Sequence, residues 1–243
     1  MKYLPSSKGK GADDNQWLSV SDLMAGLMMV FLCISVAMIH SVLAERQKIT
    51  AIALSYKENQ LSIYNALVNS FKGDLDRWGA SISDDTLTIV FQAQDAMFET
   101  GKTELSARYK GILEEFFPRY MHALKPFAES IEEVRLEGHT STGWGVSDKS
   151  DNAYFKNLKL SQERTRSVLR YISSLDTITE YEDWMKVHLA AVGYSSSRPI
   201  LNEHGLEDSV RSKRVAFRVI TNADLKIKDI LEGLIEKDAI SAL

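Results

Sequence analysis

The sequence has very little cysteine, no excess of basic charge and no clustered metal ligands. Its single cysteine is Cys33, so no disulfide can form within the chain. The formal net charge is -4 and no basic stripe is present, which argues against a nucleic-acid-binding surface. The 5 histidines are scattered without metal-ligand spacing, and neither a glycine-rich phosphate loop nor a nucleophile elbow occurs. We therefore expect no cofactor, no metal, no direct nucleic-acid partner and no enzyme activity.

One long apolar run stands out, from Trp17 to Ala44, and Asp22 is its single charged residue. The run has about 28 residues, whereas a helix needs about 20 to cross a bilayer core. It is too long for the apolar part of a signal peptide, and no small-residue cleavage pattern closes it. The sequence therefore predicts a retained transmembrane helix over residues 17–44, with a cleaved signal peptide as the alternative.

Basic residues flank this run on both sides, so its orientation is only weakly specified. Those before it are Lys2, Lys8 and Lys10, and those after it are Arg46, Lys48 and Lys57. The short tail of residues 1–16 favours a cytoplasmic N-terminus, with the C-terminal part of the chain on the outer side of the membrane.

Asp22 is unusual because a carboxylate at the centre of a membrane helix costs roughly 2.5–3.5 kcal/mol, and such a group marks a proton or ion site by default. Its helix face consists mostly of small or polar residues, which allow neighbouring helices to approach closely. The other members of this face are Gly26, Met29, Cys33, Ala37, His40 and Ala44. We expect Asp22 to face another helix. The alternative is that the helix begins near Leu23 and Asp22 caps it or reaches the headgroups.

Residues 45–78 lack proline and have apolar residues at helical spacing, which predicts a helical linker or stalk. Its role is left open between a dimer contact and packing on its own domain. Residues 79–222 alternate between strand and helix patterns, and residues 223–243 resemble a final helix. Strands are expected near residues 87–91, 134–138, 187–192 and 215–219, and helices over 105–125 and 157–175, with a kink or break at Pro118. This order predicts an α+β fold, an α/β sandwich whose four-stranded mixed sheet has helices on one face.

Four segments of this region, in order, resemble the OmpA-like peptidoglycan-binding domain. Gly138-His139-Thr140 and the stretch from Asn157 to Arg164 are similar to the family pattern G-H-T-D, loop, N-x-x-L-S-x-x-R-A. The third segment is Gly193-Tyr194 with the nearby Arg198-Pro199-Ile200, and the fourth is Lys213-Arg214-Val215-Ala216-Phe217. The resemblance implies a domain over residues 79–222 that binds the cell wall.

The family motif implies a peptidoglycan site made by Thr140, Ser141, Asn157, Leu160 and Arg164. The planar guanidinium of Arg164 suits bidentate binding of a stem-peptide carboxylate. Ser141 stands where the family has aspartate, which removes the anionic partner of the diaminopimelate ammonium group. Asp148 or Asp151 are candidates to replace that charge.

Two of these assignments have simpler alternatives. Arg164 could be a surface arginine paired with Glu163 or Asp151, since exposed ion pairs are common. Asn157 could cap the N-terminus of its helix.

A membrane helix with an aspartate near its start, followed by such a domain, is the plan of MotB-like flagellar stator subunits. The string from Trp17 to Leu32 is most similar to the ZorB family of Zorya anti-phage defence systems, and Ala25-Gly26 departs from the Met-Thr that is usual in flagellar stators. The resemblance implies a homodimer inside a ring of MotA-like (ZorA-like) multi-spanning subunits in the bacterial inner membrane. Asp22 would carry protons or sodium ions, and the periplasmic domain would bind peptidoglycan. The alternative is a passive tether between membrane and wall without ion conduction.

Overall fold

The computed structural model describes residues 11–92, 97–99, 101–143 and 151–222. The chain divides into two compact units, Met1–Ser55 and Tyr56–Leu243, and helix α1 (Gly11–Phe71) passes through the boundary between them. No glycine or proline occurs between Gly26 and Gly73, so nothing in this stretch interrupts the helix. Residues 1–10 of the expected tail and the expected helix of residues 223–243 lie outside the described residues.

The part of α1 in the first unit is apolar and uncovered. Its large apolar side chains are exposed, including Leu23 at 76% and Phe31 at 68%. By length and composition α1 is the one helix, among the described residues, that could cross a membrane. Because α1 begins at Gly11, Asp22 lies inside the helix, and the prediction that Asp22 could be its N-cap is wrong.

The last turns of α1 belong to the folded domain. Ile63, Leu67 and Phe71 recur every four residues and are completely buried in the core. The short helix α2 (Leu75–Trp78) follows and ends at Gly79, whose φ of 62° suits glycine. Ile63, Leu67 and Phe71 thus take one of the two roles left open for the linker, packing on its own domain.

The domain contains a five-stranded mixed sheet in the order β1-β2-β5-β3-β4. The strands are β1 (Ala80–Ser83), β2 (Thr88–Phe91), β3 (Ile131–His139), β4 (Leu189–Gly193) and β5 (Arg214–Thr221). The pair β3 and β4 is parallel, and the other neighbours are antiparallel. The mixed sheet is confirmed, but the expected count of four strands is wrong. The sequence of β1, Ala-Ser-Ile-Ser, is too short and polar to signal a strand, and pairing with β2 at the sheet edge makes it one.

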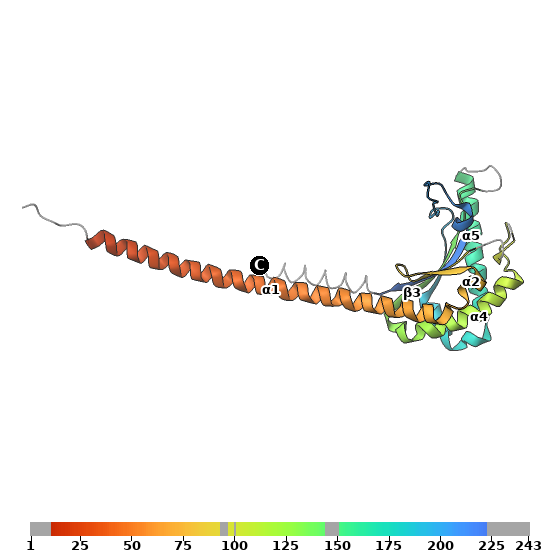
Figure 1. Cartoon of the computed structure of the whole chain (residues 1–243), viewed down its shortest axis with the longest axis horizontal. Coiled ribbons are helices and arrows are strands. Elements are labelled where there is room, and N and C mark those ends of the chain that lie inside the picture. Colours follow the sequence, from red (N-terminus) through yellow and green to blue (C-terminus); the bar gives the residue numbers. More distant parts are fainter. Residues whose placement is uncertain (1–10, 93–96, 100, 144–150, 223–243) are drawn as a thin grey trace, which may run out of the picture. The chain divides into compact units, whose positions relative to one another are not determined.

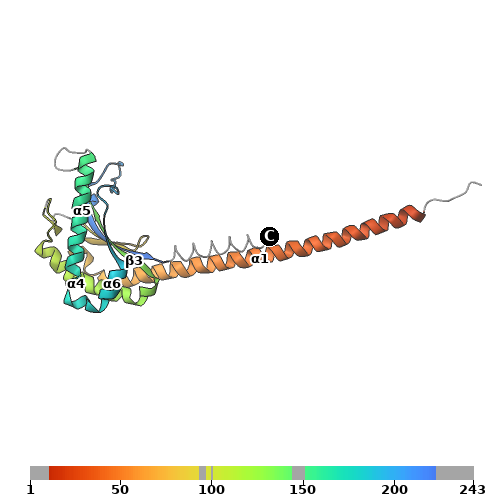
Figure 2. The ribbon, with the colours of Figure 1, turned by 180° about the vertical axis from the view of Figure 1, so that it is seen from behind.

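Helices α4 (Ala107–Leu124) and α5 (Asp151–Ile172) lie on the same side of this sheet (Figures 1 and 2). The Ser106 hydroxyl accepts a hydrogen bond from the Tyr109 amide and caps α4. Pro118 lies within α4 and does not end it, so the helix continues to Leu124. The remaining helices are the 3₁₀ helices η1 (Lys125–Ser130) and η2 (Asp176–Tyr181), and the short helices α6 (Glu182–His188) and α7 (Ser209–Ser212).

An aromatic cluster joins α4 to the sheet. The Phe116 ring centroid lies 5.0 Å from that of Phe91 in β2 and 5.1 Å from that of Phe217 in β5. Phe71, at the end of α1, packs on the same ring at 5.1 Å. These edge and tilted contacts are the arrangements that aromatic rings prefer. The core therefore fastens the end of α1 to the sheet through α4.

Helix α5 approaches β3 and β4 at two glycines. A Cβ atom added to Gly138 would lie 2.8 Å from the Ser161 carbonyl oxygen, and one added to Gly193 would lie 2.5 Å from the Gln162 nitrogen. Both neighbours are backbone atoms, which cannot move aside as a flexible side chain can. Glycine at these positions therefore sets the height of α5 above the sheet.

We predict that Gly138→Ala lowers the free energy of unfolding by about 1–3 kcal/mol, the usual cost of forcing a methyl group into a packed interior. Gly111→Ala is the matched control, because no atom lies within 4 Å of its added Cβ inside α4. Its stability should stay the same or rise by up to about 1 kcal/mol. Denaturant unfolding of the full chain in detergent measures both, and equal effects would contradict the close approach of α5.

Candidate functional site

The end of β3 is tied to α5 through one serine of the loop after β4. The Thr140 amide donates to the Ser195 carbonyl at 2.9 Å. The Ser195 amide donates to the Ser161 hydroxyl at 3.1 Å, and the Ser195 hydroxyl donates to the Tyr154 carbonyl at 2.8 Å. Thr140 and Ser141, which follow β3 directly, therefore have a fixed position beside α5.

Asn157 holds the segment that follows Ser141. Its side chain is 3% exposed, and its Nδ2 donates to the carbonyls of Ser141 at 3.1 Å and Gly143 at 3.3 Å. The prediction that Asn157 could be an N-cap is wrong, because α5 begins earlier, at Asp151. The asparagine instead donates hydrogen bonds to two loop carbonyls. The sequence around the start of the helix cannot reveal these contacts, because their partners lie in a different segment.

Arg164 lies seven residues after Asn157, which places both on one face of α5. It is 5% exposed, so the prediction that it could be a surface arginine is wrong. Its Nε donates to the Lys102 carbonyl at 3.0 Å and its Nη2 to the Glu99 carbonyl at 3.3 Å. The guanidinium also lies 4.7 Å above the Phe98 ring centroid, a cation–π contact.

The predicted site residues thus form two groups. Thr140, Ser141 and Asn157 are brought together at the end of β3. Arg164, two turns further along the same face of α5, fixes the segment around Glu99. Leu160, between them in α5, is half-buried. The Thr140 hydroxyl is buried and has no hydrogen-bond partner within the described part of the chain.

Sequence reasoning missed the residues that position this site from outside the motif. Phe98, Glu99 and Lys102 contribute a ring and two carbonyls, and backbone carbonyls leave no signature in a sequence. Glu207 was missed too, although its carboxylate accepts from the Thr142 amide at 3.0 Å. Ser161, which the family motif contains, was the one available signal for the Ser195 connection.

A buried acid and a histidine lie before these residues in β3. The His139 Nε2 is 3.1 Å from a Glu137 carboxylate oxygen, and both side chains are buried. Burial lowers the pKa of His139, and the hydrogen bond between His139 and Glu137 opposes this only in part. Burial alone would raise the pKa of Glu137, but the His139 hydrogen bond and nearby arginines lower it overall. The pair therefore contains a charged glutamate and a neutral histidine near pH 7.

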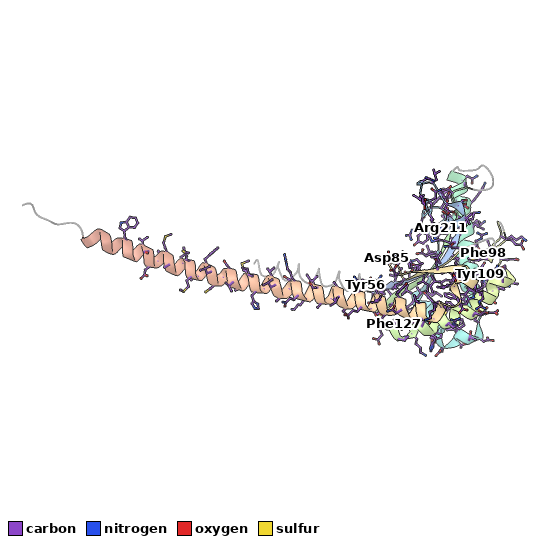
Figure 3. The ribbon with its side chains drawn as sticks, in the orientation of Figure 1. Tyr56, Asp85, Phe98, Tyr109, Phe127 and Arg211 are labelled. Carbon is purple, nitrogen blue, oxygen red and sulfur yellow. The ribbon has the colours of Figure 1, made fainter. Side chains whose placement is uncertain are left out.

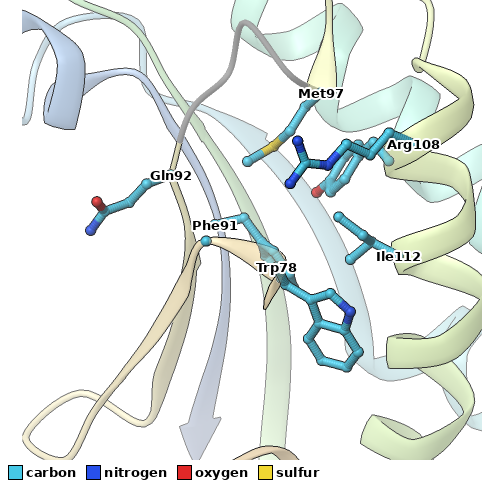
Figure 4. Close-up of a pocket in the computed structure, with 8 residues that line it drawn as sticks. Trp78, Phe91, Gln92, Met97, Arg108 and Ile112 are labelled. Carbon is cyan, nitrogen blue, oxygen red and sulfur yellow. The ribbon is translucent and has the colours of Figure 1, made fainter. Parts of the chain in front are cut away.

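A small cavity of about 70 Å³ lies away from this pair, between α2, the end of β2 and the start of α4. Its lining includes Trp78, Phe91, Met97, Arg108 and Ile112 (Figure 4). The neighbouring rings of Phe98 and Tyr109 are 5.9 Å apart (Figure 3). Ligand pockets usually enclose about 300–1,000 Å³. This cavity is too small for such a ligand and mainly apolar, so the candidate site is the end of β3 and α5.

Comparison with known proteins now identifies the family. Residues 97–213 match the model of the OmpA family. The Zorya protein ZorB of Escherichia coli, Crooks strain, is 49% identical over 231 residues, which cover 95% of this chain and 97% of the relative. The chain belongs to the ZorB family. The resemblance to ZorB and to OmpA-like domains drawn from the sequence is confirmed.

Two solved structures are also similar to this ZorB-family chain. A putative MotB like protein from Desulfovibrio vulgaris is 21% identical, with 67% of this chain and 91% of that chain covered and a TM-score of 0.46. The periplasmic domain of Helicobacter pylori MotB is 18% identical, with 63% and 89% covered and a TM-score of 0.41.

We predict that acidification from pH 7 to pH 5 destabilises the domain partly through His139. The pKa of His139 is lowered in the folded state, so on acidification the unfolded chain binds the proton first. The free energy of unfolding therefore decreases as the pH falls. His139→Gln should flatten the pH dependence of the unfolding midpoint, whereas His204→Gln at an exposed loop position should leave it unchanged. Thermal melts of the three proteins across this range measure the effect, and parallel curves for all three would contradict it.

Proposed function

We propose that this protein is an ion-driven motor subunit of a Zorya anti-phage system that is held stationary by the peptidoglycan. The observation that carries the proposal is the combination of two parts in one chain. The apolar part of α1, residues 17–44, is uncovered and bears one acid, and an OmpA-family domain follows α1. In this arrangement α1 crosses the inner membrane once, the N-terminus is cytoplasmic and the domain lies in the periplasm.

Asp22 is the proposed ion carrier. It is the single charged residue between Trp17 and Ala44 and lies within α1. An acid on a membrane helix is stable when it faces protein or water, which a surrounding ring of MotA-like (ZorA-like) subunits supplies. A proton or sodium ion neutralises the carboxylate and changes its contacts with the ring. Its affinity for the ion changes as the ring moves Asp22 between environments of different polarity.

A homodimer fits the small-residue face of α1. Two copies can approach closely where Gly26 and Ala37 replace larger side chains, because packing rather than hydrophobicity joins helices in lipid. The pair forms the axle, and the ring turns around it. Such a motor delivers torque only if the axle does not rotate.

The wall supplies that resistance through the site at the end of β3. The charge of Arg164 attracts a stem-peptide carboxylate, and Thr140 offers a buried hydroxyl at the end of β3. Asn157 and Leu160 keep the connecting segments in place or line the site. Ser141 is neutral where the family has aspartate, so contact with the diaminopimelate ammonium group is weaker than in that family.

The passive tether remains the second candidate function, because wall binding alone requires no acid in the membrane. The two functions differ in their response to a change at Asp22. No catalytic step belongs to either of them.

We predict that Asp22→Asn abolishes phage protection while the complex still assembles, because asparagine keeps the size of the side chain but cannot exchange a proton. Asp84→Asn, the same chemical change in an exposed turn, is the control and should protect fully. Plaque counts and co-purification with the ring subunit measure the two properties. Full protection by Asp22→Asn would favour the tether.

We predict that Arg164→Ala weakens binding of the detergent-solubilised full chain to isolated peptidoglycan by roughly tenfold or more, because hydrogen bonds to a charged group are worth about 1.5–3 kcal/mol. Arg166→Ala, on the exposed side of α5, should bind normally. Co-sedimentation measures the affinity, and melting temperatures show whether each variant is folded. A folded Arg164→Ala protein with unchanged affinity would exclude this residue from the wall site.

A further inference from the structure

Helices α4 and α5 cover one side of the sheet (Figures 1 and 2). Four arginines lie on or beside its other face, three from β3 and β5 and one from the loop after β4. Side chains alternate along a strand, so this face receives the residues that lie between the buried ones of β3 and β5. We call the following set the arginine face: Arg135, Arg198, Arg214 and Arg218. Arg135 and Arg218 are direct cross-strand partners. Like charges in this position repel each other, so their placement needs an explanation.

Among the residues that the structure describes, only part of this charge is neutralised by an ion pair. Arg135 is held by Glu133, with its Nε 2.6 Å and its Nη2 3.1 Å from the two carboxylate oxygens. Arg218 is half-buried, and within the described part of the chain it forms no ion pair closer than 4.0 Å. The Glu133 carboxylate thus neutralises Arg135 at contact distance. Arg218, in contrast, interacts with Glu137 only at longer range, where its charge helps to lower the Glu137 pKa.

Two members of the arginine face, Arg198 and Arg214, lie near Glu137. Arg198 is stacked on the Tyr194 ring, 3.8 Å from its centroid, and its Nη1 is 3.8 Å from a Glu137 oxygen. The Arg198 side chain is 46% exposed and so remains accessible from solvent. Arg214 donates to the carbonyls of Arg198 and Ser212, and burial lowers its pKa. A nearby anion would stabilise this partly desolvated charge.

Counted over the described residues, the charge balance of the arginine face is positive. Its four arginines and the two glutamates paired with them, Glu133 and Glu137, sum to +2 on a chain whose total is -4. His139, beside Glu137, is neutral near pH 7 because its pKa is lowered. The remaining residues that the strand register places on this face are uncharged, namely Ser81, Ser83, Thr88, Val90, Ala190, Val192, Ala216 and Ile220.

We propose that the arginine face is a second carboxylate-binding surface, through which the domain contacts further stem-peptide carboxylates of the peptidoglycan. This inference rests on the proposed wall binding. Its location supports it, since β3 leads from Arg135 directly to Thr140, roughly 17 Å further along the strand at 3.3 Å per residue. Peptidoglycan repeats its carboxylates along the polymer, so one wall fragment can reach both places.

A second contact has a mechanical consequence. A domain held at one point can pivot about that point, whereas two separate contacts oppose rotation. The two contacts also differ in their response to salt. Arg198 and Arg218 lie where solvent ions screen them, whereas Arg164 is buried and is screened much less. The contribution of the arginine face should therefore disappear first as the salt concentration rises.

The test is co-sedimentation of the detergent-solubilised full chain with isolated peptidoglycan at sodium chloride concentrations from low to physiological and above. The double variant Arg198→Gln/Arg218→Gln should bind roughly three- to tenfold more weakly at low salt, as expected for two partly exposed ion pairs, and should lose most of the salt dependence. Arg198→Lys/Arg218→Lys keeps the charge and should retain most of the affinity. Arg166→Gln/Arg170→Gln removes the same charge from the exposed side of α5 and should bind as the unmodified protein does.

The outcomes separate this inference from the proposed function. If Arg164→Ala loses binding and the double glutamine variant, shown to be folded by its melting curve, binds normally, the second surface is wrong and the wall anchor stands. If only the double variant is weakened, the second surface stands and the predicted role of Arg164 is wrong. A protein that binds no peptidoglycan overturns both. A double variant that binds the wall normally but fails to co-purify with the ring subunit or a second copy would make the arginine face a protein interface and overturn the inference.

Discussion

Helix α5 lies on β3 and β4 at a distance that only glycine permits, and the arrangement of the candidate site depends on this contact. Gly138 and Gly193 leave no room for a Cβ atom against the backbone of Ser161 and Gln162. Direct contact between the backbone of α5 and the two strands thereby fixes the height and register of the helix above the sheet. Asn157, Ser161 and Arg164 project from the same helix, so each meets its loop because α5 is close to the sheet.

The loops in turn depend on these three side chains. Asn157 binds the carbonyls that follow β3, Ser161 binds the amide that follows β4, and Arg164 binds carbonyls in the segment before α4. Segments far apart in the sequence are brought to one end of the domain by a single helix face. A change that raised α5 would therefore loosen all three segments together, which explains why one motif contains the helix residues and the strand-end glycine.

Patterns that repeat along the chain made most of the fold predictable. The alternation of Val215, Phe217 and Val219 marks a strand with one buried face, and the motif from Asn157 to Arg164 identifies the domain. Contacts to backbone atoms were not predictable, because any residue can supply a carbonyl. The hydrogen bonds from Arg164 to the carbonyls of Glu99 and Lys102 are an example of such contacts. Strand β1 was missed for a related reason, since its pairing with β2 rather than its side chains makes it a strand.

The proposed function places two demands on one chain: Asp22 must exchange ions in the membrane, and the domain must not turn. The second demand is met only if the folded domain is immobilised by the wall in a living cell. The most direct measurement is single-molecule tracking of the N-terminally labelled full chain in the inner membrane, before and after enzymatic digestion of the peptidoglycan. We expect most of the tracked molecules to be immobile before digestion of the peptidoglycan and mobile after it. Free diffusion of the protein in cells with an intact wall would contradict it.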